Sequence, residues 1–356
     1  MPHGNHVSVL LEESVVALSL RPDGVYVDAT YGRGGHTRAI LARLGARGRV
    51  VAIDRDPEAE RSAASIGDVR LVFRRARFSA LDDVLDALAI DRVDGVLLDL
   101  GISSPQIDTP ARGFSFRHDG PLDMRMDPDA GEPAAAFLAR ASLRELTEVI
   151  RDHGEERLAQ PIARAIVAAR SVRPIATTRE LAAIVAQAVG ARTRSDWRQD
   201  PATRTFQALR IAVNEELAEL ERVLPRAAAR LCHDGRLAVI SFHSLEDRIV
   251  KRFIARASAP YGGDPRLARV PIAHSDLPVP PLAPVGRAIR PSADECDANP
   301  RARSATLRVA RRTAGALPAD WPSAQRASGG SASDGPPRGR EPPGGRRAQR
   351  ASGGSS

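Results

Sequence analysis

Short apolar runs alternate with amphipathic segments through the first hundred residues of the chain. Four runs have the length and apolar content of buried strands. They occupy residues 26–28, 50–54, 69–73 and 96–99. Residues 37–42 and 82–88 lie between such runs and have helical character. This alternation predicts an α/β fold with a doubly wound, mostly parallel sheet.

The alternation stops after residue 133, where helical patterns alone continue. Those patterns cover residues 134–139, 143–150, 157–169, 178–188 and 205–216. Strand character returns at 235–242 and 305–310, with a helix over 245–256 between them and a loop predicted over 258–303. The simplest interpretation is a helical domain, 134–217, inserted between two parts of the sheet domain, 1–133 and 218–313.

From residue 314 the composition changes to Gly, Ser, Pro, Ala and Arg, and the octapeptide AQRASGGS occurs twice. Such a segment has too little apolar surface to offset the entropy of ordering it. Residues 314–356 are therefore predicted to be a disordered basic tail.

Composition excludes several classes of protein. Hydrophobic residues make up 42% of the 356, but no apolar run approaches the roughly 20 residues of a membrane span. The N-terminus lacks the pattern of a signal peptide. The two cysteines form neither a disulfide framework nor a metal-binding pattern. A reduced, cytoplasmic protein without a structural metal is expected.

The net charge of +8 suits a protein that binds a polyanion. However, Lys251 is the only lysine, so 51 of the 52 basic residues are arginine. That skew is typical of coding bias, and the charge therefore carries modest weight.

A glycine-rich loop, DATYGRGGH at 28–36, follows the first predicted strand and opens a helix. Asp54 ends the second strand, 20 residues after Gly34, where an acid can accept hydrogen bonds from ribose hydroxyls. Asp28, close to the loop, would repel a pyrophosphate and suit a sulfonium. The pattern thus favours S-adenosylmethionine over a nicotinamide cofactor, although a tight structural turn would also explain the glycines.

The fourth strand ends in Asp99, and Ser103-Ser104-Pro105-Gln106 follows it closely. Ligands bind at the carboxyl ends of strands in open α/β sheets. A residue before proline disfavours α geometry, so the backbone carbonyls here are expected to stay outside a helix. A carboxylate and free carbonyls would form an acceptor-rich pocket for an amine.

With these features the chain resembles the MraW type of bacterial small-subunit ribosomal RNA cytosine-N4 methyltransferases over about residues 5–312. The segments that carry the resemblance are HVSVL at 6–10, DATYGRGGHT at 28–37, AIDRDP at 52–57, DGVLLDLGISSPQ and RGFSFRHDGPLDMRM within 94–126, HGEER at 153–157, TFQALRIAVNEEL at 205–217, ISFHSLEDRIVKRF at 240–253 and NPRARSATLRVA at 299–310. Two positions depart from the family pattern: Ser8, where proline is expected, and His153, where tyrosine is usual.

The resemblance implies a Rossmann-like, class I S-adenosylmethionine-dependent methyltransferase. It implies that the acceptor is a cytidine N4 amine in small-subunit ribosomal RNA, free or within the small subunit. The cofactor-binding positions of the family fall on Gly34, Gly35, His36, Asp54, Phe78, Asp99 and Gln106. Phe78 would lie against the adenine, although core packing explains a phenylalanine there equally well.

Methyl transfer to a weakly nucleophilic amine needs acceptors that hold its hydrogens. Asp99 and the backbone of Ser103 and Ser104 are the candidates. Phe242 is expected to stack on the base. His243 is expected either to contact the base or a phosphate, or to cap the helix that follows.

Arginines are the candidate contacts for the RNA backbone. They are Arg112, Arg117 and Arg125 near the pocket, and Arg192, Arg194, Arg198 and Arg204 in the helical segment. Solvated surface positions are the alternative for each of them.

Two other functions remain open at this stage. A DNA amino-methyltransferase would carry an acid or serine followed by Pro-Pro and an aromatic residue, and the Ser-Ser-Pro-Gln run argues against it. A non-catalytic RNA-binding factor would not need the cofactor loop and Asp99. Binding of S-adenosylmethionine discriminates between that factor and an enzyme.

Overall fold

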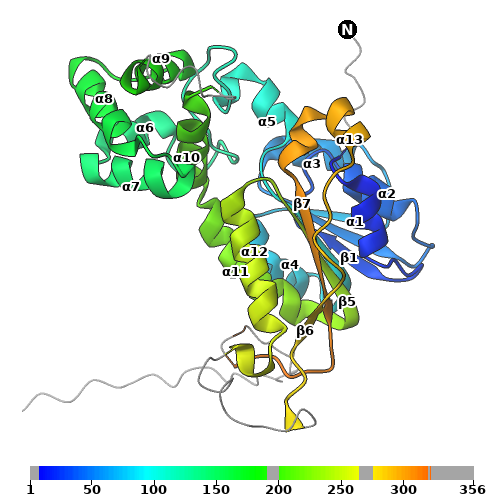
Figure 1. Cartoon of the computed structure of the whole chain (residues 1–356). Coiled ribbons are helices and arrows are strands. Elements are labelled where there is room, and N and C mark those ends of the chain that lie inside the picture. Colours follow the sequence, from blue (N-terminus) through cyan, green and yellow to red (C-terminus); the bar gives the residue numbers. More distant parts are fainter. Residues whose placement is uncertain (1–7, 191–199, 264–275, 320, 322–356) are drawn as a thin grey trace, which may run out of the picture. The chain divides into compact units, whose positions relative to one another are not determined.

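The computed structural model describes residues 8–190, 200–263, 276–319 and 321. It contains a seven-stranded sheet with the order β3-β2-β1-β4-β5-β7-β6 (Figure 1). The strands are β1 Val25–Asp28, β2 Arg49–Asp54, β3 Leu71–Arg75, β4 Val93–Asp99, β5 Leu231–Ser241, β6 Leu282–Pro284 and β7 Thr306–Arg312. β1 to β5 run parallel, whereas β7 and β6 pair antiparallel. The predicted α/β class with a mostly parallel sheet is confirmed.

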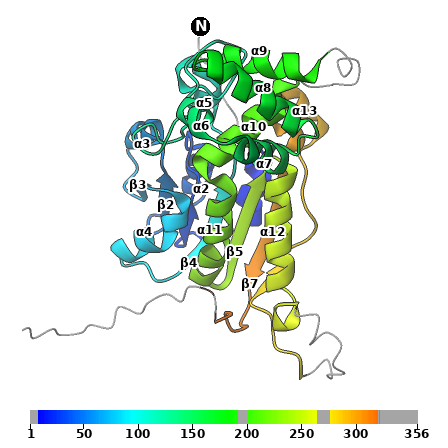
Figure 2. The same ribbon diagram turned by 90° about the vertical axis from the view of Figure 1, so that its left-hand side faces the viewer.

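Helices cover both faces of the sheet, because alternate residues of each strand point to opposite sides. In β4, Val96 and Leu98 join the core beneath α4, α11 and α12, whereas Leu97 joins the core beneath α1 and α2. The helices around the sheet are α1 Leu11–Ala17, α2 Gly35–Leu41, α3 Pro57–Ala64, α4 Leu81–Ala87, α11 Glu216–Arg230 and α12 Ser244–Ala257. Figure 2 shows α11 and α12 packed side by side along one face. Burial on both faces explains why the strands are continuous apolar runs.

Five further helices share a second core. They are α6 Ala134–Arg140, α7 Leu143–Gly154, α8 Ala159–Val172, α9 Thr178–Val189 and α10 Ala202–Asn214. Their core also contains Phe114, Leu122 and Met124, so it begins before the predicted boundary at residue 134. We call residues 114–189 and 202–214 the helical layer. Within the described parts of the chain, no helix is long and apolar enough to cross a membrane.

Several elements differ from the sequence predictions. The predicted helix at 205–216 is interrupted, because Glu215 has a left-handed backbone (φ 54°) that separates α10 from the 15-residue α11. Helices α1 and α3 were not predicted. The predicted loop over 258–303 also contains β6 and the short helix α13, Ala293–Ala298.

The predicted start of the disordered tail, at residue 314, is wrong. Trp321 is only 6% exposed and stacks on Phe253 of α12, with 5.2 Å between ring centroids. Leu317 packs against the same core. Sparse apolar residues in a Gly- and Pro-rich stretch gave no periodic signal, yet one tryptophan buries enough surface to hold the chain there.

Candidate active site

A cavity of about 150 Å³ lies at the carboxyl ends of the parallel strands. Its walls come from residues 29–33 after β1, 54–55 at the end of β2, 76–78 after β3 and 99–104 after β4. The strand order reverses between β1 and β4, and open α/β sheets bind ligands at that point. The cavity therefore lies where the strand-end argument placed the site.

The glycine-rich loop after β1 is shaped by close backbone contacts. Gly34 has a left-handed backbone (φ 72°), and a Cβ there would lie 2.5 Å from the Tyr31 hydroxyl. A Cβ on Gly35 would lie 2.0 Å from Ser8 Oγ. Neither glycine lines the cavity, but the turn they form presents Gly32 and His36 to it. In this structure the two glycines shape the loop, and their contact with a cofactor stays a prediction.

Asp54 stands at the end of β2, and both its carboxylate oxygens accept backbone hydrogen bonds. The Gly32 N–H donates to Oδ2 at 2.7 Å, and the Asp56 N–H donates to Oδ1 at 2.9 Å. Burial raises the pKa of the Asp54 carboxyl to about 6, although these two bonds oppose the shift. The carboxylate is thus mostly ionised at neutral pH and retains lone pairs for further donors.

His36 and Asp99 form the second acidic part of the cavity. His36 Nε2 lies 3.3 Å from Asp99 Oδ2, and the imidazole is 4% exposed. Burial disfavours the charged imidazolium, but the adjacent Asp99 carboxylate outweighs it, so the pKa of His36 lies above its ordinary value. Among the described residues, Asp99 Oδ1 and His36 Nδ1 are buried without a hydrogen-bond partner.

Asp28 does not line the cavity, although its place beside the glycine-rich loop led us to expect it near a sulfonium. Its carboxylate is fully buried and accepts a 2.6 Å hydrogen bond from the Thr37 hydroxyl. Burial raises its pKa. Asp28 therefore anchors α2 to β1, whereas the carboxylates of Asp54 and Asp99 line the cavity.

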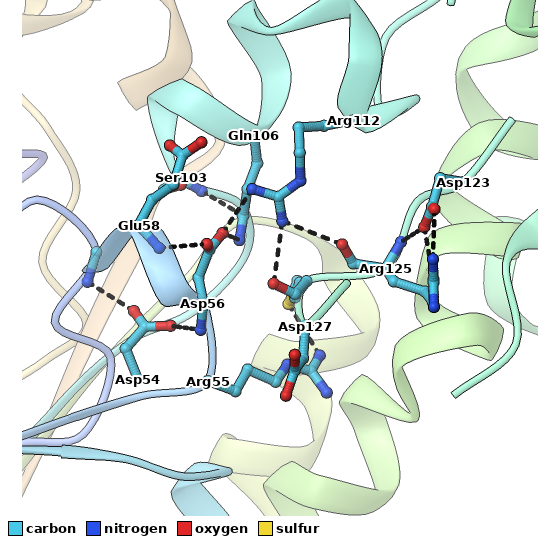
Figure 3. Close-up of polar contacts among 12 residues, drawn as sticks. Asp54, Arg55, Asp56, Glu58, Ser103, Gln106, Arg112, Asp123, Arg125 and Asp127 are labelled. Atoms are coloured by element: carbon cyan, nitrogen blue, oxygen red, sulfur yellow. Dashed lines mark hydrogen bonds and ion pairs between the residues drawn. The ribbon is translucent and has the colours of Figure 1, made fainter. Parts of the chain in front are cut away.

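Asp56 connects the cofactor side of the cavity with the loop after β4 (Figure 3). Its Oδ2 accepts from Gln106 Nε2 at 2.8 Å and from Arg112 Nη1 at 2.9 Å, and its Oδ1 accepts from the Glu58 N–H. The Gln106 carbonyl oxygen in turn accepts from the Ser103 N–H at 2.9 Å. Gln106, predicted to bind the cofactor, lines the cavity and also links these two loops.

The expectation that the Ser103 and Ser104 carbonyls stay outside a helix is wrong. Residues Ser104–Asp108 form the short helix α5, with Ser103 as its N-cap, and the Ser103 carbonyl accepts from the Ile107 N–H. Proline is tolerated in the first turn of a helix because its missing N–H has no intrahelical partner there. Both serines still line the cavity.

Phe78 and Phe242 line the cavity from η1, Phe78–Ala80, and from the end of β5. His243 does not line it. The imidazole is the N-cap of α12, where Nδ1 accepts from the Glu246 N–H, and Nε2 lies 3.1 Å from Glu246 Oε1. The structure thus supplies the capping interaction that was one of the two expectations for His243.

The arginines expected to bind RNA have different surroundings. Arg112 donates to Asp56 and to the Arg125 and Met126 carbonyls, so its guanidinium is committed within the protein. Arg125 pairs with Asp123, whereas Arg117 is exposed. Arg204 contacts the Glu155 carbonyl. The other three predicted contacts, Arg192, Arg194 and Arg198, lie outside the described residues.

Sequence reasoning missed the cavity wall contributed by the second half of the chain. The residues concerned are Glu216, Glu219 and Leu220 of α11, Glu246 of α12, and Arg301, together with Arg55 and Met126. Arg55 donates to the Asn214 carbonyl at 3.2 Å and approaches Met126 Sδ. Most of these residues lie within segments that carry the family resemblance, but the resemblance assigned no role to them.

Comparison with known proteins identifies the family. The model of the MraW methylase family matches residues 3–313. "Ribosomal RNA small subunit methyltransferase H" of Methylobacillus flagellatus is 59% identical over 310 residues, which are 87% of this chain and 95% of that protein. The protein of the same name from Burkholderia pseudomallei strain K96243 is 60% identical over 314 residues, 87% of this chain and 98% of its own length.

The chain belongs to the MraW methylase family. It is a methyltransferase with a Rossmann-like fold, as the sequence predicted. A solved rRNA methylase from Streptococcus thermophilus aligns with a TM-score of 0.36 and 11% identity, covering 85% of this chain and 94% of that chain.

The cavity of this MraW methylase has carboxylate acceptors and an aromatic ring, which are groups that fit S-adenosylmethionine. Asp54 contributes a carboxylate to the cavity wall, and Phe78 contributes an aromatic ring. Asp99 Oδ1 is buried without a partner, which is costly unless a ligand donates to it. The ammonium group of a methionine moiety is such a donor.

Proposed function

We propose that this protein transfers a methyl group from S-adenosylmethionine to the N4 amine of a cytidine in small-subunit ribosomal RNA. S-adenosylmethionine supplies the methyl group from its sulfonium. The observation that carries the proposal is the arrangement of Asp54 and the His36–Asp99 pair in one cavity at the ends of β2 and β4. The curated relatives are named for ribosomal RNA small subunit methylation, which supports the choice of substrate.

On the cofactor side, each residue has a distinct role. The Asp54 carboxylate binds the ribose hydroxyls, and the Phe78 ring packs on the adenine. Asp99, held by His36, accepts from the methionine ammonium. Gln106 positions the loop after β4 against this side through Asp56.

On the acceptor side, the target base leaves its stack and enters beside Phe242, whose ring stacks on it. The Ser103 carbonyl is bonded within α5. We therefore assign the N4 hydrogens to the backbone carbonyls of residues 100–102, which precede α5 and line the same cavity. Acceptors fixed in place stabilise the positive charge that develops on N4, and alignment of the amine with the methyl carbon supplies much of the rate.

The helical layer is proposed to be the inserted domain that recognises the RNA. Its separate core and its position between α5 and α11 in the chain support that role. The substrate is proposed to be either free ribosomal RNA or the assembled small subunit, and the enzyme is expected in the cytoplasm, where ribosomes are made.

A binding and transfer assay tests the proposal. Purified protein is titrated with radiolabelled S-adenosylmethionine and then incubated with small-subunit ribosomal RNA, assembled small subunits or duplex DNA. Label in N4-methylcytidine from either RNA substrate supports the proposal. Transfer to duplex DNA alone would favour a DNA methyltransferase, and cofactor binding without transfer to any of the three would contradict the proposed substrate.

A further inference from the structure

Ion pairing separates the exposed arginines of this protein into two groups. Arg43, Arg47 and Arg61 each lie within 4 Å of a carboxylate, those of Glu12, Asp23 and Glu58. A paired guanidinium is less available to a phosphate, because binding would require it to leave its partner. Exposed cations without a carboxylate partner are therefore the candidates for binding a polyanion.

Four such cations surround the outer side of α12. Lys251 and Arg252 project from the helix, and Arg287 and Arg290 belong to the segment that joins β6 to α13. All four are exposed, and their side chains form no ion pair or hydrogen bond with any described residue. We call these four residues, together with Arg308 of β7, the α12 cation surface.

The backbone brings these residues together. Ile289 bridges to Leu307 of β7, which places the 287–290 segment beside the strand and next to α12 (Figure 2). A groove of about 210 Å³ lies between the two, and Lys251, Arg287 and Arg308 line it with Ser258. Three cationic side chains therefore line the groove beside apolar residues such as Ile254 and Val285, and cationic side chains are donors that bind phosphate.

The acids around this surface leave a positive excess. Asp247 pairs with Arg308 at 2.7 Å. The Arg308 guanidinium, helped by Arg290 and Lys251 at longer range, lowers the pKa of the Asp247 carboxyl. Five cations against this one carboxylate give a net charge of +4. The acidic residues of α13 follow Arg290 in the chain and bound the surface at that end.

The surface also lies in line with the active site. Phe242 of the cavity lies two residues before Ser244, where α12 begins, and Lys251 lies seven residues beyond Ser244. At 1.5 Å per residue, that distance is about 10 Å along the axis. A strand whose target base enters the cavity can therefore reach the α12 cation surface with the nucleotides next to it.

We propose that the α12 cation surface binds the phosphates of the RNA strand that flanks the target cytidine. This inference rests on the proposed function and adds the path of the RNA along the catalytic domain. It is independent of the arginines predicted in the helical layer. Arg308 shares its charge with Asp247, so Lys251, Arg287 and Arg290 are the residues to test.

The test compares two triple variants of the full-length protein with the same change in net charge. The first carries Lys251→Gln, Arg287→Gln and Arg290→Gln. The matched control carries Arg43→Gln, Arg47→Gln and Arg61→Gln, at paired positions around α2 and α3. Fluorescence anisotropy measures the affinity for a small-subunit ribosomal RNA fragment at several salt concentrations, and calorimetry measures the affinity for S-adenosylmethionine.

We expect the first variant to lose at least about tenfold in RNA affinity near 100 mM salt. Log affinity falls as log salt rises, and the magnitude of this negative slope should decrease by about 2–3, since each lost phosphate contact contributes 0.7–0.9. Cofactor affinity and kcat at saturating RNA should be unchanged, so the defect appears in KM. The control variant should retain the wild-type salt slope.

Equal RNA affinities and salt slopes for the two variants would overturn the proposal. An equal loss for duplex DNA and RNA would show general attraction of polyanions and would also overturn it. If the wild-type protein methylates the RNA and the first variant keeps the wild-type RNA affinity and salt slope, only the role of the α12 cation surface is refuted. A wild-type protein that fails to methylate RNA refutes the proposed function itself.

Discussion

Cofactor binding should weaken in mild acid because of Asp54. Burial raises the pKa of this carboxyl to about 6, from 3.8 in an unstructured chain. Ribose hydroxyls donate to the ionised form, so binding below pH 6 must first remove a proton. At pH 5 about ten molecules in eleven are protonated. The affinity should therefore be about tenfold lower at pH 5 than at pH 7, or about 1.4 kcal/mol.

Isothermal calorimetry from pH 5 to 7.5 measures this linkage. Wild-type protein should release close to one proton per cofactor bound near pH 5, which appears as a dependence of the heat on the buffer. Asp54→Asn cannot titrate at this position. It should bind more weakly at pH 7 by about 1.5–3 kcal/mol, the range for a hydrogen bond to a charged group.

The comparison of the two proteins isolates Asp54 from His36, whose raised pKa also contributes to the pH profile. The reasoning is refuted if wild type and Asp54→Asn lose affinity in parallel between pH 7 and 5. The same shift has a second consequence for the cofactor-free protein. Its folded state takes up a proton between pH 6 and 3.8 that the unfolded chain does not, so this carboxyl destabilises the fold as pH rises through that window.

Three other changes test the roles assigned above. Asp99→Asn should lower cofactor affinity about tenfold or more in a cofactor titration, while turnover at saturating cofactor largely recovers; unaltered affinity with collapsed turnover would make Asp99 the group that acts on the amine. Asp56→Ala should reduce the free energy of unfolding by about 3 kcal/mol in a urea titration, since it leaves the largely buried Arg112 guanidinium without its carboxylate partner. A loss below 0.5 kcal/mol would contradict the linking role of Asp56. Truncation after residue 324 should leave the Tm unchanged. Truncation after residue 313 removes Trp321 and should lower the Tm, with a loss of about 3–5 kcal/mol in the free energy of unfolding. Equal Tm values for the two truncated proteins would show that Trp321 contributes little.

The sheet could be predicted because its signal is local. Val96 to Leu98 are buried on both faces of β4, and that burial requires a continuous apolar run that can be read without knowing the neighbours. The position of the strand-end acids at the ligand site could be predicted in the same way. Asp54 and Asp99 both line the cavity, since parallel strands bring their carboxyl ends to one edge.

The errors of the sequence analysis share a physical cause, which is dependence on distant or conformationally special residues. Glu215 separates two helices by one left-handed residue within an unbroken helical pattern. Trp321 orders its segment only because Phe253, far away in the sequence, offers a ring to pack on. Asp28 was expected to suit a sulfonium because it lies beside the glycines, yet its carboxylate is buried and accepts a hydrogen bond from the Thr37 hydroxyl.

Asp56 shows why neither the acid at the end of β2 nor the loop after β4 describes the site by itself. Its backbone N–H holds Asp54, the proposed ribose ligand, while its side chain holds Gln106 and, through it, the Ser103 N–H. Asp54 at the end of β2 and the loop after β4 are therefore bonded to the same residue. Arg112 adds the carbonyls of residues 125 and 126, and the Met126 N–H donates to Asn214 at the end of α10. Asp56 is thus connected, through Arg112 and the 125–126 backbone, to the end of α10 in the helical layer as well as to Asp54 and the loop after β4.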